Sequence, residues 1–192
     1  MIRIVLATHN AHKVTELTRI LGPALEGLEL VAYDGPEPVE DGTTFEQNAL
    51  IKARAAAAHT GLPALADDSG ICVDALGGAP GIHSARYAGT RVDADNVAHL
   101  LAQLGDEPNR AAHFTCAAAF VVGDEEFVEV GVWPGTVLAE PVGGGGFGYD
   151  PIFKPEGLSV SSAELRPDEK NAISHRARAF GQLMPRVRVR LL

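Results

Sequence analysis

The sequence has little cysteine, little tryptophan and no long hydrophobic run. It contains two cysteines and one tryptophan among 192 residues. Since Cys72 and Cys116 both lie in apolar stretches, we expect buried thiols and neither a disulfide framework nor a metal site. No apolar run approaches the roughly 20 residues that a membrane-spanning helix needs. A first strand that begins at Ile2 leaves no room for a signal peptide, so we expect a cytoplasmic protein without membrane contact.

The sequence is also poor in positively charged residues. Lysine and arginine number 16 against 25 acidic residues, which gives a net charge of -9. This balance argues against binding to a long nucleic acid, which needs a basic surface. It leaves room for a small phosphorylated ligand, because such a ligand needs only a local cluster of cations. The candidate members of that cluster are Lys13, Lys52, Arg86, Lys170 and Arg176.

Hydrophobic residues are plentiful at 46%, which excludes a disordered chain and allows one α/β domain over residues 1–192. Helical spacing predicts helices at 11–21, 44–60, 93–104 and 175–184, with Asp93 and Ser174 as N-caps. Apolar runs predict strands at 2–7, 28–32, 62–66 and 71–73, and a hairpin of 112–122 with 126–133. Helices that alternate with strands before a hairpin predict a mixed, twisted sheet with helices on it and a second lobe built from the hairpin.

The most informative segment is Asp67-Asp68-Ser69-Gly70, which follows the predicted strand at 62–66. Adjacent strand residues point to opposite faces, so one carboxylate can face a cleft while its neighbour turns into the scaffold. A carboxylate that faces a cleft can bind Mg²⁺ or accept a proton from water. The alternative is an ordinary turn closed by Asx hydrogen bonds.

Two further segments have the residues of a phosphate site. Residues 8–13 lead from a strand into a helix N-terminus, where free amides, the helix dipole and Lys13 favour an anion. The alternative is a plain turn capped by Asn10. Glu40 precedes the helix at 44–60, on which Asn48 and Lys52 share a face and could reach a phosphate or Glu40. The alternative there is a solvated helix face.

Two segments near the C-terminus have the residues expected of a binding site for a flat aromatic ring, such as a nucleotide base. Residues 143–151 combine glycines, which permit close backbone approach, with Phe147 as a stacking face and Asp150 as an acceptor. A flexible loop with aromatic packing is the alternative. In residues 170–176, Arg176 and the helix amides could donate to a carbonyl oxygen on a base edge. A capped helix start with surface charge is the alternative.

Taken together, six segments resemble the inosine/xanthosine triphosphate pyrophosphatase family. They occur in the expected order: Leu6–Asn10 with Lys13, Thr44–Ala49 with Lys52 and Ala53, Ala66–Gly70, Leu76–Tyr87, Gly145–Phe153, and Glu169–Asn171 with Ile173–Arg176. Each segment alone is a weak signal, but six in order make chance resemblance very improbable.

The resemblance implies an elongated, two-lobed mixed α/β fold with a long twisted central sheet and a cleft between the lobes. It also implies a homodimer that uses Mg²⁺ and converts ITP, XTP and their deoxy forms to the monophosphate and pyrophosphate. Carried over residue by residue, Glu40 and Asp68 hold Mg²⁺, and Asp68 is the catalytic proton acceptor. The substrate-binding residues implied are Thr8, His9, Asn10, Ala11, His12, Lys13, Lys52, Ser69, Phe147, Gly148, Tyr149, Asp150, Lys170, His175 and Arg176.

The chain departs from the family at His9, where glycine is most common. A positive φ there would strain histidine, and the side chain would lie near the phosphates.

Two rival functions remain. A Maf-type pyrophosphatase is disfavoured by Phe147–Asp150 and Ser174–Arg176. A nucleotide-binding regulator without catalysis is disfavoured by the presence of Glu40, Asp68 and Lys13.

Overall fold

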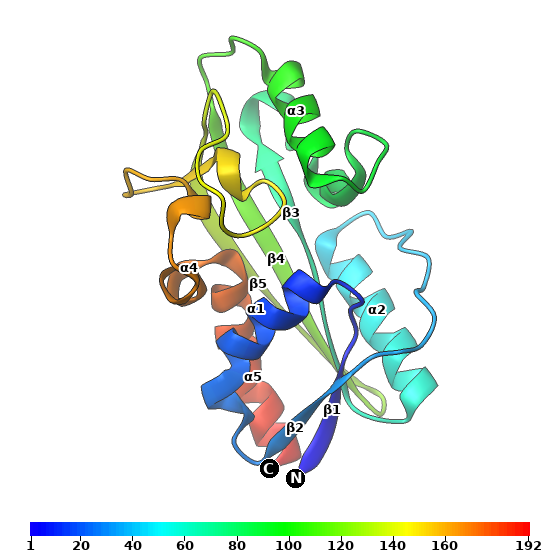
Figure 1. Ribbon diagram of the computed structural model, residues 1–192. Coiled ribbons are helices and arrows are strands. Elements are labelled where there is room, and N and C mark those ends of the chain that lie inside the picture. Colours follow the sequence, from blue (N-terminus) through cyan, green and yellow to red (C-terminus); the bar gives the residue numbers. More distant parts are fainter. The chain divides into compact units, whose positions relative to one another are not determined.

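A six-stranded mixed sheet forms the centre of the fold (Figure 1). The structure is a computed structural model that describes residues 1–192 apart from the side chain of Pro23. The strands, β1 (Ile2–Leu6), β2 (Leu28–Ala32), β3 (Ala64–Val73), β4 (Ala111–Val122), β5 (Glu125–Val137) and β6 (Phe153–Pro155), lie in the order β2-β1-β3-β4-β5-β6. β1 is parallel to β2 and β3, and β6 is antiparallel to β5. The predicted mixed α/β class is confirmed.

Five α-helices accompany the sheet: α1 (Ala11–Leu21), α2 (Phe45–Thr60), α3 (Asp93–Leu104), α4 (Pro167–Ile173) and α5 (His175–Leu191). No helix among the described residues is long and apolar enough to cross a bilayer.

The chain divides into two compact units. Unit 1 contains residues 1–68, 116–131 and 175–192, and unit 2 contains residues 69–115 and 132–174. Three strands, β3, β4 and β5, contribute residues to both units. Each unit has its own buried core.

The core of unit 1 has two parts. In one, α1 packs beside α5 (Figure 1), and Leu17 and Phe180 of these helices are fully buried with Phe120 of β4. In the other, Ala49, Ala53 and Ala56 form a fully buried stripe of α2 against alanines and valines of the sheet. Small side chains at this spacing share one helix face, so α2 can lie close to the strands.

The core of unit 2 is aromatic. The rings of Phe114 and Phe153 meet edge to face at 4.6 Å, and Trp133 lies 5.4 Å from Phe153. Leu100 and Leu104 of α3 pack in the same cluster. This packing anchors the segment that runs from Tyr149 through Ile152, both of which are buried.

The largest correction to the predicted elements concerns β3. The sequence predicts separate strands at 62–66 and 71–73 with a break at the carboxylates, but β3 runs unbroken from Ala64 to Val73. Asp67 and Asp68 therefore lie inside a buried strand. Polar groups survive there because each carboxylate has an ammonium or guanidinium partner, as described below.

Smaller corrections concern the helix ends. The cap of α2 is Thr44, which accepts from Gln47 N, so the helix begins at Phe45, one residue later than predicted. Asp93 is the first residue of α3 and not its cap. Helix α5 continues past Pro185 to Leu191, because Val187 extends its buried face and offsets a proline penalty of about 3 kcal/mol.

Candidate functional site

A cluster of buried and half-buried charges lies in unit 1, built from α1, α2, β3 and α5. We call it the charge cluster: Lys13, Glu16, Lys52, Asp67, Asp68 and Arg176. Asp67 Oδ2 accepts from Lys13 Nζ at 3.1 Å and from Arg176 Nε at 3.0 Å. Burial alone would raise the pKa of Asp67, but Lys13 and Arg176 outweigh it and hold that pKa well below its usual range. Lys13 and Arg176 thus favour the charged form of Asp67.

Arg176 is 2% exposed, and two of its donors are taken up by carboxylates. Besides Asp67, it donates from Nη1 to Glu16 Oε2 at 2.8 Å. The sequence predicted a donor to a base edge, whereas the structure places the guanidinium in the charge cluster between β3 and α1. Glu16 was missed, although its position three residues after Lys13 puts both on one face of α1.

Asp68 points to a second group of charges. Lys52 Nζ lies 3.3 Å from Asp68 Oδ1 and 3.0 Å from Glu40 Oε2, so two carboxylates converge on one cation. Burial tends to lower the pKa of Lys52, but Asp68, Asp67 and Glu40 outweigh it and raise that pKa. Burial raises the pKa of Asp68, and Lys52 only partly offsets it. The two adjacent aspartates therefore have opposite shifts, as expected for opposite faces of a strand.

The donor set of Asp68 and Glu40 suits a divalent cation. Asp68 Oδ2 is buried and accepts no hydrogen bond from the described residues. Within that same part of the chain, no three His, Cys, Asp or Glu side chains gather as a complete metal cage. One or two carboxylates completed by substrate phosphates are the usual protein share of a Mg²⁺ site.

The β1–α1 loop, residues 7–10, differs in detail from the predicted anion site. The side chain of Asn10 caps α1 and accepts from His12 N and Lys13 N. Those amides are already engaged, so Lys13 is the cation that the segment contributes. Burial lowers the pKa of Lys13, and Asp67 partly offsets this. No non-glycine residue in the described chain has a positive φ, so His9 is not strained.

In unit 2, the predicted ring-binding residues form a hydrogen-bonded loop. Asp150 is 2% exposed and accepts from Phe147 N at 2.9 Å, Ser162 Oγ at 2.5 Å and Lys170 Nζ at 2.7 Å. Lys170 Nζ also lies 5.0 Å from the centre of the Phe147 ring. Asp150 thus holds the backbone of Phe147 in place instead of presenting free acceptors. The sequence analysis missed Ser162, because a serine at that position carries no local signal of a contact with Asp150.

Two further contacts hold this loop. The buried hydroxyl of Tyr149 donates to Ser84 O at 2.6 Å, and burial raises the pKa of Tyr149. Gly148 N donates to Asp93 Oδ2 at 2.7 Å, which explains why Asp93 does not cap α3. Tyr149 is therefore structural, while the half-buried ring of Phe147 is the accessible aromatic face.

The remaining predicted residues are placed as follows. Ser69 is half-buried in β3, and His175 is buried at the first turn of α5. Thr8 is half-buried in the β1–α1 loop. Ala11 and His12 are exposed at the start of α1. Cys116 is buried and Cys72 half-buried, both as free thiols, so the expectation of buried thiols is confirmed for Cys116 only.

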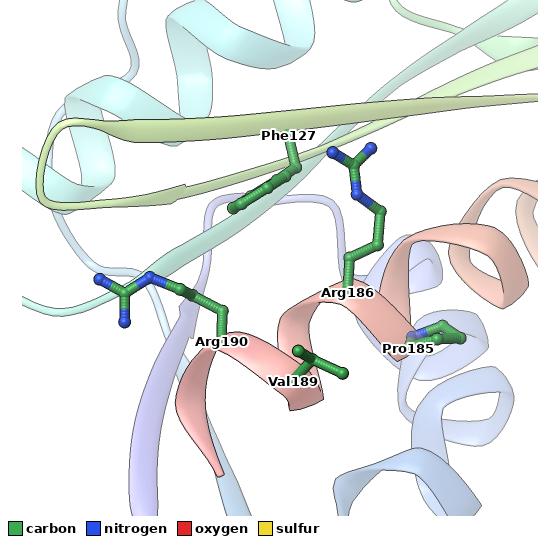
Figure 2. A pocket seen from close by; sticks show the side chains of 5 residues that line it. All are labelled: Phe127, Pro185, Arg186, Val189 and Arg190. Carbon is green, nitrogen blue, oxygen red and sulfur yellow. The ribbon is translucent and has the colours of Figure 1, made fainter.

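A surface groove in unit 1 shares no residue with the charge cluster. Figure 2 shows its lining, which combines Phe127 of β5 with Pro185, Arg186, Val189 and Arg190 of α5. Both arginines have acidic partners on β5: Arg186 pairs with Glu129 and Arg190 with Glu125. The groove offers no unpaired cation for a phosphate.

A mixed sheet that carries adjacent carboxylates beside half-buried lysines is typical of proteins that handle phosphorylated ligands with a cation. The chain belongs to the Ham1 family, which matches it over residues 4–186. This confirms the resemblance found in the sequence.

Individual similar proteins support the same family assignment. The chain is 62% identical to the dITP/XTP pyrophosphatase of Leifsonia xyli subsp. xyli, with 98% of this chain and 96% of the relative covered. It is 53% identical to the protein of that name from Streptomyces coelicolor, with 98% of each covered. Among solved structures, a HAM1 protein from Coxiella burnetii matches with a TM-score of 0.88 at 43% identity, over 97% of this chain and 98% of that one.

Proposed function

We propose that this protein hydrolyses the triphosphates of non-standard purine nucleosides, ITP, dITP, XTP and dXTP, to the monophosphate and pyrophosphate. The enzyme removes these nucleotides from the cytoplasmic pool and works as a homodimer. The observation that carries the proposal is the convergence of Asp68 and Glu40 on Lys52, with Asp68 Oδ2 accepting no hydrogen bond from the described residues. The names of the relatives supply the substrate class.

Glu40 and Asp68 would hold Mg²⁺, which supplies charge neutralisation on the phosphates. Asp68 accepts the proton of the attacking water. Lys13 and Lys52 stabilise the charge that builds on the pyrophosphate leaving group, with the loop from Thr8 to Asn10 beside them. Such positioning and electrostatics are most of what a protein contributes to phosphoryl chemistry.

The base is bound by residues of unit 2. Phe147 stacks on the purine, Gly148 permits close approach, and Tyr149 and Asp150 hold the loop in shape. Lys170 and Ser69 complete the contacts to base and sugar, while Arg176 holds Asp67 in the charge cluster. Donors directed at a 6-keto oxygen would be left unpaired by the 6-amino group of ATP, at about 1–3 kcal/mol each.

Pyrophosphate release from ITP, dTTP and ATP, each with and without Mg²⁺, tests the proposal. We expect Mg²⁺-dependent release from ITP and little from the other two. Release from dTTP would favour the Maf-type alternative, and binding without release would favour a regulator.

In ¹⁸O-labelled water the label should enter IMP, since attack is at the α-phosphorus. Label in pyrophosphate would place the attack elsewhere.

A further inference from the structure

The β2–α2 loop, residues 33–44, carries Glu40 and is attached to the rest of unit 1 at separate points. Tyr33 is buried, and its hydroxyl donates to Pro36 O at 2.9 Å. Glu40 pairs with Lys52, and Gly42 N donates to Asn48 Oδ1 at 2.9 Å. Among the described residues, the stretch between Pro36 and Glu40 has a further attachment, which comes from the β1–α1 loop.

That attachment is His9. Its Nδ1 lies 3.2 Å from Glu37 Oε1, and its ring packs on Tyr33 with the centroids 5.4 Å apart. Tyr33 is in turn held edge-on by His59 of α2, at 5.8 Å. His9 therefore contacts two residues of the β2–α2 loop from the loop that precedes Lys13. Glycine, the usual residue of the resembled family at this position, has no side chain and can make neither contact.

These contacts are too exposed to matter much for overall stability. The side chains of His9 and Glu37 are 36% and 59% exposed, and exposed ion pairs contribute little to folding. Their effect is instead local, because they connect two loops that each carry a residue of the proposed phosphate and cation chemistry. A small energy suffices to bias the position of a short loop segment.

We propose that His9 is a positioning residue that couples phosphate binding at the β1–α1 loop to cation binding at Glu40, through its contacts with Glu37 and Tyr33. The inference rests on the proposed function, since it concerns the ligands named there. Coupling of this kind is reciprocal: a phosphate that orders His9 favours the cation-binding position of Glu40, and the cation favours the phosphate.

The test replaces Glu37, which lies outside the proposed binding machinery. Calorimetry of Mg²⁺ binding in the presence of pyrophosphate should show affinity reduced about two- to fivefold in Glu37→Ala, the effect expected of one exposed ion pair. Glu37→Gln keeps an acceptor for His9 and should recover part of the loss. Asp34→Asn removes the same charge from the same loop and should bind Mg²⁺ like the parent.

Two further measurements separate coupling from a general structural defect. Pyrophosphate should slow amide hydrogen exchange at Glu40 and Asp41 in the parent, and do so less in Glu37→Ala. His9→Gly combined with Glu37→Ala should weaken Mg²⁺ binding no more than His9→Gly alone. Unchanged Mg²⁺ affinity and exchange in Glu37→Ala would overturn the coupling even if the parent hydrolyses ITP. A parent that releases no pyrophosphate from ITP would overturn the proposed function instead.

Discussion

The side chain of Asp68 is expected to contribute more to turnover than any other single group. We expect Asp68→Asn to keep the fold and to lower turnover of ITP at least about a hundredfold, because the amide can neither accept the proton nor hold Mg²⁺ with a negative charge. Steady-state kinetics with circular dichroism of both proteins checks this. Turnover within tenfold of the parent would remove Asp68 from the chemistry. Asp34→Asn, an exposed carboxylate change on the β2–α2 loop, serves as the control.

Asp67, the neighbour of Asp68 in β3, should affect the stability of the folded protein and the way that this stability depends on pH. Its pKa is lowered in the folded state, so its contribution to stability is present above the unfolded value of about 4 and is lost as pH falls below it. Urea denaturation between about pH 6 and pH 3 should show the parent losing more stability on acidification than Asp67→Asn. Parallel pH profiles for the two proteins would mean that Lys13 and Arg176 do not depress the pKa of Asp67.

The sequence predicted the opposite roles of these aspartates but not their partners. Adjacent residues in a strand face opposite ways, so the division of Asp67 and Asp68 follows from alternation alone. The partners of Asp67 come from far along the chain: Arg176 is 109 residues away, and it meets Glu16 across 160 residues. No local pattern encodes such a pairing, which arises only when α1 and α5 pack together.

Among the larger elements, the contact between β5 and α5 depends on the absence of a side chain at Gly131. A Cβ there would meet His175 O and come within 2.5 Å of Ala179 N, both backbone atoms of α5. We expect Gly131→Ala to destabilise the protein by about 1–3 kcal/mol, as overpacking does. Gly181→Ala, in open space on the same helix, should instead stabilise by about 0.5–1 kcal/mol. Thermal unfolding of both variants checks the pair, and equal shifts would contradict it.

The ends of the helices and strands show which boundaries local sequence patterns can predict and which they cannot. The helix at 11–21 and the strand at 28–32 were predicted residue for residue, because amphipathic spacing and a Gly22-Pro23 stop are local signals. Helix α5 was predicted to stop at Met184, before a proline. It continues because Val187 is buried in the core of unit 1, and burial of that kind is decided by tertiary packing.

At the scale of the whole chain, the proposed phosphate contacts and the proposed base contacts can be measured separately. Pyrophosphate with Mg²⁺ should depend on Lys13 and Lys52 of unit 1, while IMP should depend on Phe147 of unit 2. A ligand at about 100 times its Kd stabilises the folded state by about 2.7 kcal/mol. For a chain of this size, that corresponds to a rise in Tm of about 5–10 °C.

Thermal unfolding of two variants with each ligand then separates the contributions. Phe147→Ala should lose most of the Tm rise caused by IMP and keep the rise caused by pyrophosphate, because stacking on the ring concerns the base alone. Lys13→Ala should lose most of the pyrophosphate rise and keep more of the IMP rise. Each shift is measured against the variant's own unliganded Tm, since removing Lys13 also leaves Asp67 with one cation fewer. An IMP shift that survives in Phe147→Ala would move the base away from this loop and leave the phosphate assignment intact.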